Sequence, residues 1–192
     1  MLQLIAKSER ETEHPNSIEK YVHSHPAALR HVTSAKPAVK SYAADVYFGV
    51  NTFVLISEDG KRTNIRYRFV PEVGIKTLSD EEFKAKSENY LSDELRSRLP
   101  DNPIVFKLVA QIAQEGDRTD DCTSLWPDDR QLVELGVLKL DNMLSEQESL
   151  DTQKRVIYDP IPRVKGVEPA DDPMLEMRAA VYLLSGKQRR EA

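Results

Sequence analysis

The chain of 192 residues lacks several features that would assign a protein to a class at once. Its single cysteine, Cys122, excludes an internal disulfide, and no second cysteine or histidine stands near it at the spacing of a metal site. No apolar run approaches the ~20 residues that span a bilayer, and the N-terminal apolar stretch is too short for a secretory signal. The sequence therefore predicts a soluble protein without a membrane partner, cytoplasmic by default.

An excess of positive charge is also missing. The net charge is -5, and acidic and basic residues are mixed along the chain, so the sequence predicts no nucleic-acid partner. The interleaved arginines and aromatics of "RYRFV" (66–70) do not change this expectation. The acidic stretch 116–129 lacks the sixth-position glycine and the closing glutamate of a calcium loop. What remains is an ordinary globular composition, 40% hydrophobic and 31% charged, for one domain.

Hydrophobic periodicity predicts helices at both ends of the chain and strands between them. Residues 16–32 read as a short helical pair, with Pro26 where the second helix could start. Residues 46–70 alternate as two strands joined at Asp59-Gly60, which favours a hairpin. Residues 78–99 turn helical, with Ser79 and Glu82 spaced as a capping box and Ser92 able to cap a second helix.

Two more strands are predicted at 103–113 and 131–143, on either side of a turn-rich loop that holds Trp126. The proline-rich segment 157–173 should be an extended crossing rather than sheet or helix. Four substantial strands with helices at both ends indicate an α+β fold with an antiparallel sheet.

The stretch "DPMLEMRAAVY" (172–182) predicts the last helix. Asp172 is a favoured N-cap and Pro173 a favoured first residue, so the helix should run from 173 towards 189. Arg178 and Tyr182 are then neighbours at i and i+4, with Arg189 further along nearly the same stripe.

This spacing leaves two interpretations open. In the first, the Tyr182 ring packs half-buried against a sheet and both arginines are solvated. In the second, the tyrosine works as a phenolate, and tyrosinate is one of the few axial ligands that proteins offer to haem iron. A free phenol has a pKa of about 10, and lowering it by ~3 units takes roughly 4 kcal/mol, within reach of a bound ferric ion and a close guanidinium.

The chain resembles a known family at several collinear stretches across residues 16–190. "WPDDRQLVELGVLKL", "YDPIPRVKGVEPADDPMLEMRAAVY", "YFGVNTF" and "RYRFVPEVG" are similar to the C-terminal half of the haem-dependent catalases, most of all to the small catalase-related peroxidases. The pattern VxGxEPxxDPMLxxRxxxY has many fixed positions, which makes the resemblance specific. It implies haem as the cofactor and a peroxide as the substrate.

The resemblance also assigns roles to individual residues. Tyr182 matches the proximal tyrosine that binds the haem iron, and Arg178 matches the arginine that keeps its oxygen ionised. Asp172 matches an acidic residue that supports this arginine, a role that its position as a helix cap also allows. Arg189 matches an arginine that meets a haem propionate. Asn51 stands where larger catalases carry a histidine of the proximal network.

Family members carry a longer N-terminal portion, which supplies the first strands of an eight-stranded barrel, the distal histidine and a distal asparagine. The resemblance therefore implies that residues 1–192 form a single, partial catalase-like domain with about half of the barrel. No distal base is nominated, because the chain's histidines match no catalytic position of the family: His14, His23, His25 and His31. Four strands cannot close a barrel, so we expect self-association or a partner chain to cover the open sheet edges.

Two functions follow from the resemblance. The first is a haem peroxidase that reduces hydrogen peroxide or an organic peroxide. The alternative is a non-catalytic remnant that binds haem weakly and lacks a distal base. Some relatives are exported by a leader, so a periplasmic location stays open beside the cytoplasmic one.

Overall fold

The computed structural model describes residues 5, 7–99 and 101–191, and contacts divide the chain into two compact units, residues 1–37 and 38–192. In the first unit, α2 (Ser17–Ser24) and α3 (Pro26–Thr33) form the predicted helical pair. Asn16 and Glu19 make a capping box at the start of α2, and Pro26 opens α3 as expected. The prediction of one domain over residues 1–192 stays a prediction.

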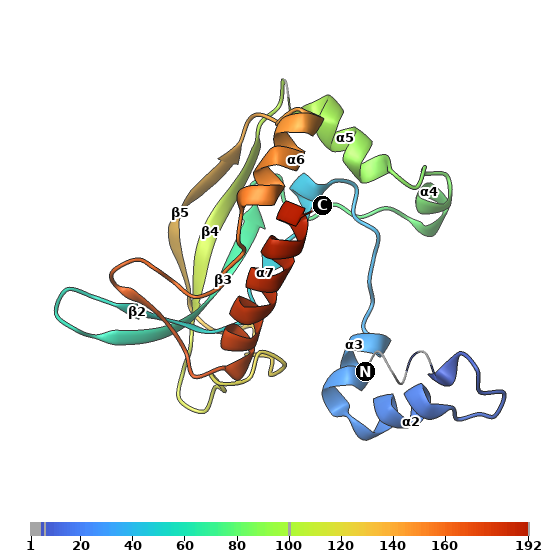
Figure 1. The fold of residues 1–192 in the computed structure, drawn as a ribbon, viewed down its shortest axis with the longest axis horizontal. Helices are drawn as coiled ribbons and strands as arrows, with labels where there is room; N and C mark the ends of the chain where they lie inside the picture. Colours follow the sequence, from blue (N-terminus) through green and yellow to red (C-terminus); the bar gives the residue numbers. More distant parts are fainter. Residues whose placement is uncertain (1–4, 6, 100, 192) are drawn as a thin grey trace. The chain divides into compact units, whose positions relative to one another are not determined.

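The second unit is built on an antiparallel, open sheet of six strands, and helices flank it (Figure 1). Its order is β5-β4-β3-β2-β6, and β1 pairs beside β2 along the same edge of β3. A strand forms in each of the four predicted regions: β2 (Phe53–Ile56), β3 (Arg62–Pro71), β4 (Ile104–Ile112) and β5 (Leu132–Leu140). The α+β class is confirmed, and the hairpin turn at Asp59-Gly60 is present, with Gly60 at a φ of 84°.

The sheet differs from the prediction at two places. Residues 46–57 do not form one strand, because the chain breaks at 49–52 into β1 (Tyr47–Phe48) and β2. The expectation that 157–173 contains no strand is wrong, since β6 (Val167–Pro169) pairs with β2. Gly166 supplies the turn with a φ of 85°, and Pro169 is tolerated because β6 is an edge strand.

The helices also show one error and one omission. The Ser79–Glu82 capping box is confirmed at the start of α4 (Asp80–Lys84). Ser92 is not a cap, because α5 (Tyr90–Arg98) begins earlier, after Asn89, so Ser92 lies inside the helix. A further helix, α6 (Glu146–Arg155), was not predicted, although Ser145 and Glu148 form a capping box at its start.

The two faces of the sheet have different chemistry. Ile65 is fully buried, and it shares a face with Phe69, Phe106 and Ala110. One end of this face packs under the short helix η1 (Tyr42–Ala44) and α5, where the buried cluster consists of Ala43, Leu99, Ile104 and Phe106. The opposite face carries buried polar side chains, Arg66 and Gln111, which are cross-strand partners.

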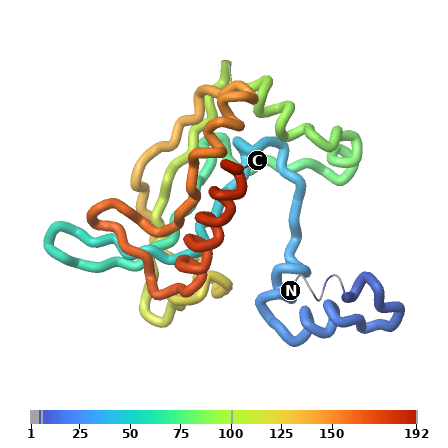
Figure 2. The backbone as a smooth tube through the Cα atoms, in the orientation of Figure 1, coloured from blue at the N-terminus to red at the C-terminus, as the bar shows by residue number. Residues whose placement is uncertain are grey.

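The last helix, α7 (Pro173–Glu191), runs beside α6, and both lie in front of the sheet in the view of Figures 1 and 2. A β-carbon at the buried Gly186 would lie 2.1 Å from Cδ1 of Ile157. The absence of a side chain at this position therefore lets the segment after α6 approach α7 closely.

Candidate functional site

Asp172 fixes the start of α7 and also belongs to a buried polar cluster. One carboxylate oxygen accepts a hydrogen bond from the backbone N–H of Met174 at 2.9 Å, as an N-cap does. The other accepts from the side-chain amide of Asn51 at 3.0 Å. Asp172 is only 5% exposed, so both oxygens are used inside the protein. The capping role of Asp172 is thus present, and the support of Arg178 implied by the family resemblance stays a prediction.

Asn51 joins this carboxylate to the arginine one turn into the helix. Its amide nitrogen donates to Asp172, and its amide oxygen accepts a hydrogen bond from Nη1 of Arg178. Asn51 is 4% exposed and lies between β1 and β2, where the chain leaves the sheet edge. An amide has one donor end and one acceptor end, so an anion on one side and a cation on the other select a single orientation.

The guanidinium of Arg178 lies beside the phenolic oxygen of Tyr182. Nη2 of Arg178 lies 3.4 Å from that oxygen, long for a hydrogen bond but close enough for the positive charge to act on it. The guanidinium carbon lies 5.5 Å from the centre of the Tyr182 ring. The i, i+4 spacing predicted this contact, whereas the Asn51 bridge depends on a residue more than one hundred positions away.

Arg189 belongs to a separate set of contacts at the other end of α7. Its guanidinium donates to the backbone oxygens of Gln153 at 2.9 Å and Val156 at 2.6 Å, and to the hydroxyl of Ser185 at 2.6 Å. It therefore ties the last turn of α7 to the C-terminal end of α6, where carbonyls lack helical partners. The propionate contact expected for Arg189 stays a prediction.

Tyr158 connects these two sets of contacts, and sequence reasoning had not singled it out. Its ring meets the Tyr182 ring edge-on, with centroids 6.3 Å apart, and the Arg189 guanidinium carbon lies 5.7 Å from its centre. Its position in the proline-rich segment gave no periodic signal. The close approach at Gly186 is what brings this segment to the helix.

All four histidines lie in the unit of residues 1–37 and are absent from residues 38–192. His14 pairs with Glu19 at 2.9 Å, and hydrogen bonds from this histidine and from Asn16 hold the pKa of that carboxyl below its usual range. His25 stacks on Tyr21 with ring centroids 3.9 Å apart. Within the described residues, no group of three or more His, Cys, Asp or Glu side chains could hold a metal ion.

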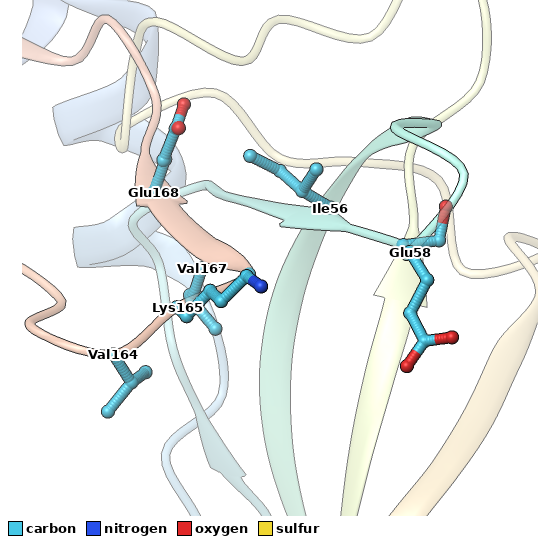
Figure 3. A pocket seen from close by; sticks show the side chains of 8 residues that line it. Ile56, Glu58, Val164, Lys165, Val167 and Glu168 are labelled. Carbon is cyan, nitrogen blue, oxygen red and sulfur yellow. The ribbon is translucent and has the colours of Figure 1, made fainter.

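A surface pocket lies between the end of β2 and the segment leading into β6 (Figure 3). Side chains of opposite charge, including Glu58, Lys165 and Glu168, line it together with Ile56 and Val167. None of its lining residues belongs to the Asp172–Asn51–Arg178–Tyr182 cluster. None of the helices in the described ranges has the length and apolar character needed to cross a bilayer.

Comparison with known proteins agrees with the fold of sheet and flanking helices. The family model described as Catalase matches residues 5–191. The chain belongs to the catalase family. Among its catalase relatives is a catalase-related peroxidase of Synechococcus elongatus, 37% identical over 149 residues that make up 78% of this chain and 43% of that protein. Another, from Mycolicibacterium paratuberculosis, is 34% identical over 178 residues, or 91% of this chain and 56% of that protein.

The chain thus spans about half the length of the catalase-related peroxidases it matches. Solved catalases share its fold over 98% of its residues. A bacterial catalase superposes with a TM-score of 0.76 at 20% identity, and a fungal catalase with a TM-score of 0.78 at 18% identity. This chain corresponds to 40% and 41% of those two chains, respectively.

Proposed function

We propose that this chain supplies the proximal side of a haem site in a peroxidase of the catalase family, with the Tyr182 oxygen as the iron ligand. The observation that carries the proposal is the path of contacts from Asp172 through Asn51 and Arg178 to Tyr182. A structural tyrosine needs no such arrangement. A phenolate does, because a fixed positive charge beside the oxygen favours its anionic form.

The donor set suits ferric haem. Tyrosine oxygen is an established axial ligand of haem iron, and outer partners that orient such a ligand tune its strength. Apolar side chains of α7 next to this stripe are exposed, among them Met177 at 54% and Val181 at 51%, and could contact an apolar macrocycle. Haem would supply the redox chemistry for peroxide reduction, which breaks the O–O bond and takes up two electrons and two protons.

The chain's own residues would act by holding charge in place. If Tyr182 held the iron, its phenol would give its proton to solvent, and the guanidinium of Arg178 would stabilise the oxygen that remains. The Asn51 amide restrains that guanidinium without adding charge. Asp172, which is buried with Asn51, balances the positive charge of the arginine through the amide, so these two charges cancel.

A second candidate is a haem-binding fragment without peroxidase turnover. It is favoured by one observation, the absence of histidine from residues 38–192, the unit that contains the tyrosine cluster. Cleavage of a bound peroxide needs a base within hydrogen-bond reach to move its proton. The two candidates differ in activity but share the same iron ligand.

The test is a titration of the purified protein with haemin, followed by its absorption spectrum. We expect the charge-transfer band of a ferric tyrosinate in the wild type, loss of this band in Tyr182→Phe, and its retention in the control Tyr42→Phe. Peroxide turnover by the loaded wild type then separates the candidates, since the fragment should do no better than free haemin. An identical spectrum for wild type and Tyr182→Phe would remove the proposed ligand.

A further inference from the structure

Arg66 is a buried cation that the proposed haem site does not use directly. It lies in the "RYRFV" stretch of β3 and is 5% exposed. Its Nη1 donates to the backbone oxygen of Ser124 at 2.6 Å, and Nη2 to that of Asp121 at 3.0 Å. Its guanidinium carbon also lies 4.3 Å from the centre of the Trp126 ring. The residue thus holds a loop against the sheet by hydrogen bonds and a cation–π contact.

This loop, residues 113–131, is called the Trp126 loop below. Two neighbouring side chains of the sheet bind this loop. Arg66 is the first, and its cross-strand partner Gln111 donates to the backbone oxygen of Pro127 at 3.0 Å. Trp126 is 6% exposed, and its indole N–H donates to the backbone oxygen of Arg118 at 2.7 Å. The loop is therefore fixed on the polar face of the sheet.

Stability alone does not account for a charge at this position. Within the described residues, no carboxylate lies within salt-bridge distance of Arg66. Burial lowers the pKa of its guanidinium, and more distant carboxylates such as Asp172 and Asp121 oppose this effect. Burying a charge without a paired anion is costly, and an apolar side chain of similar volume often packs at least as stably. A cation retained here needs another reason.

A further hydrogen bond of Arg66 reaches Thr52, the residue after Asn51. Nε of Arg66 donates to the Thr52 hydroxyl at 3.3 Å, and the backbone oxygen of Thr52 accepts from Ala170 at 3.2 Å. Thr52 is 1% exposed and directly follows Asn51, whose amide bridges the aspartate and the arginine of the cluster. Arg66 thus holds the residue that directly follows Asn51 in the chain.

The electrostatics of the Trp126 loop agree with the contacts of Arg66. The pKa of the Cys122 thiol, within the loop, is raised by burial and then by the carboxylates of Asp172 and Asp121. The geometric evidence is that Arg66 contacts both the loop, at Ser124, and Thr52, the residue after Asn51.

We propose that Arg66, clamped by Trp126, is a positioning residue for the proximal tyrosine. It keeps Asn51 in the one orientation that holds the Arg178 guanidinium beside the phenolic oxygen. The inference rests on the proposed function of Tyr182, and it extends that site to a loop that contributes no ligand. It also gives the "RYRFV" motif and the only tryptophan of the chain a shared role.

The test compares Arg66→Met with Arg62→Met, an exposed arginine of the same strand that pairs with Glu168. In the haem-free protein, we expect the NMR signals of the Asn51 side-chain amide to move in Arg66→Met and to stay in place in Arg62→Met. With haemin, we expect affinity to fall about tenfold in Arg66→Met only, as for other residues that orient a ligand, and the tyrosinate band to weaken. Arg66→Lys, which keeps the charge, should restore part of the affinity.

An unchanged Asn51 amide in a folded Arg66→Met protein would overturn the proposal. If that variant does not fold, Trp126→Phe decides, because it keeps an aromatic ring but loses the hydrogen bond to Arg118. There a shifted Asn51 signal supports the proposal, and an unchanged one contradicts it. Failure of the wild type to bind haemin would refute the proposed function instead, and the haem-free NMR comparison would still test the positioning role.

Discussion

The start of α7 and the edge strand β5 lie in the same unit, but they differ in whether their side chains have partners within the chain. Around Asp172 and Asn51, buried polar groups are paired with one another, and both residues are about 95% shielded from solvent. Along β5, apolar side chains are open to solvent, with Val137 62% exposed and Leu132 47% exposed. The strand also ends the sheet order, so its outer edge is open within the described part of the chain.

This difference shows which part of the molecule needs no further partner and which part does. A satisfied polar cluster does not depend on a further partner, because each buried donor and acceptor has its counterpart within the chain. An open apolar edge strand does depend on one, since unpaired strand edges associate with other chains. The chain thus combines a polar cluster whose buried groups are paired internally with an open sheet edge at β5.

We expect the largest loss of stability from a substitution at Asp172, within the paired polar cluster. Replacing Asp172 with Ala removes a helix cap and leaves the Asn51 amide without its acceptor, which should cost about 2–4 kcal/mol in the free energy of unfolding. Asp172→Asn keeps a capping oxygen and is the matched control, with a smaller loss. Urea unfolding measures both, and equal stability of Asp172→Ala and wild type would contradict the role given to the cluster.

Two glycines allow the same substitution on each side of the comparison. Gly186→Ala places a methyl group against Ile157 and should destabilise the protein by about 1–3 kcal/mol. Gly136→Ala lies on β5, where a β-carbon meets nothing within 4 Å, and should change stability by no more than about 0.5 kcal/mol. Thermal unfolding of both variants is the measurement, and similar shifts would show that α7 does not need this close contact.

The open edge at β5 is tested by introducing a charged side chain. Val137→Lys should leave the free energy of unfolding within about 0.5 kcal/mol of wild type, because the position is exposed. It should lower concentration-dependent association, since a lysine on an edge strand opposes pairing with another chain. Sedimentation velocity over a range of protein concentrations checks this, with the equally exposed Val164→Lys as control. Association that persists unchanged would place the contact elsewhere.

The smallest effect is a dependence on pH in the Trp126 loop. Hydrogen bonds from Arg130 at 2.8 and 3.0 Å hold the pKa of the Asp117 carboxyl below its usual range. A lowered pKa in the folded state adds stability that is present above the unfolded value of about 3.9 and is lost as the pH falls through the folded one. Asp117→Asn should therefore be less stable than wild type at pH 6, and the difference should shrink towards pH 3. A difference that does not change with pH would contradict this.

Local patterns predicted the elements of the fold better than its contacts. Alternation gave the four long strands, and Asp172 with Pro173 gave the start of α7, because these signals lie within a few neighbouring residues. The pairing of β6 with β2 was missed, since a three-residue strand among prolines has no periodicity. Helix α6 was overlooked despite its capping box, as its residues form no apolar stripe and none is buried.

The same limit applies to the candidate site. Helical spacing placed Arg178 beside Tyr182, and family resemblance pointed to Asn51 and Asp172. The contacts of Arg66 and Tyr158 depend on tertiary approach, through the Trp126 loop and through the close packing at Gly186. No sequence period brings such segments together, so only the folded chain reveals these contacts.

The most direct test of the central claim is resonance Raman spectroscopy of the haemin-loaded protein, with excitation in the charge-transfer band. If the Tyr182 oxygen binds the iron, tyrosinate ring modes will be enhanced, will shift when the tyrosines carry ring deuterium, and will vanish in Tyr182→Phe while persisting in Tyr158→Phe. A loaded protein that shows no tyrosinate modes, or shows the same modes without Tyr182, contradicts the account.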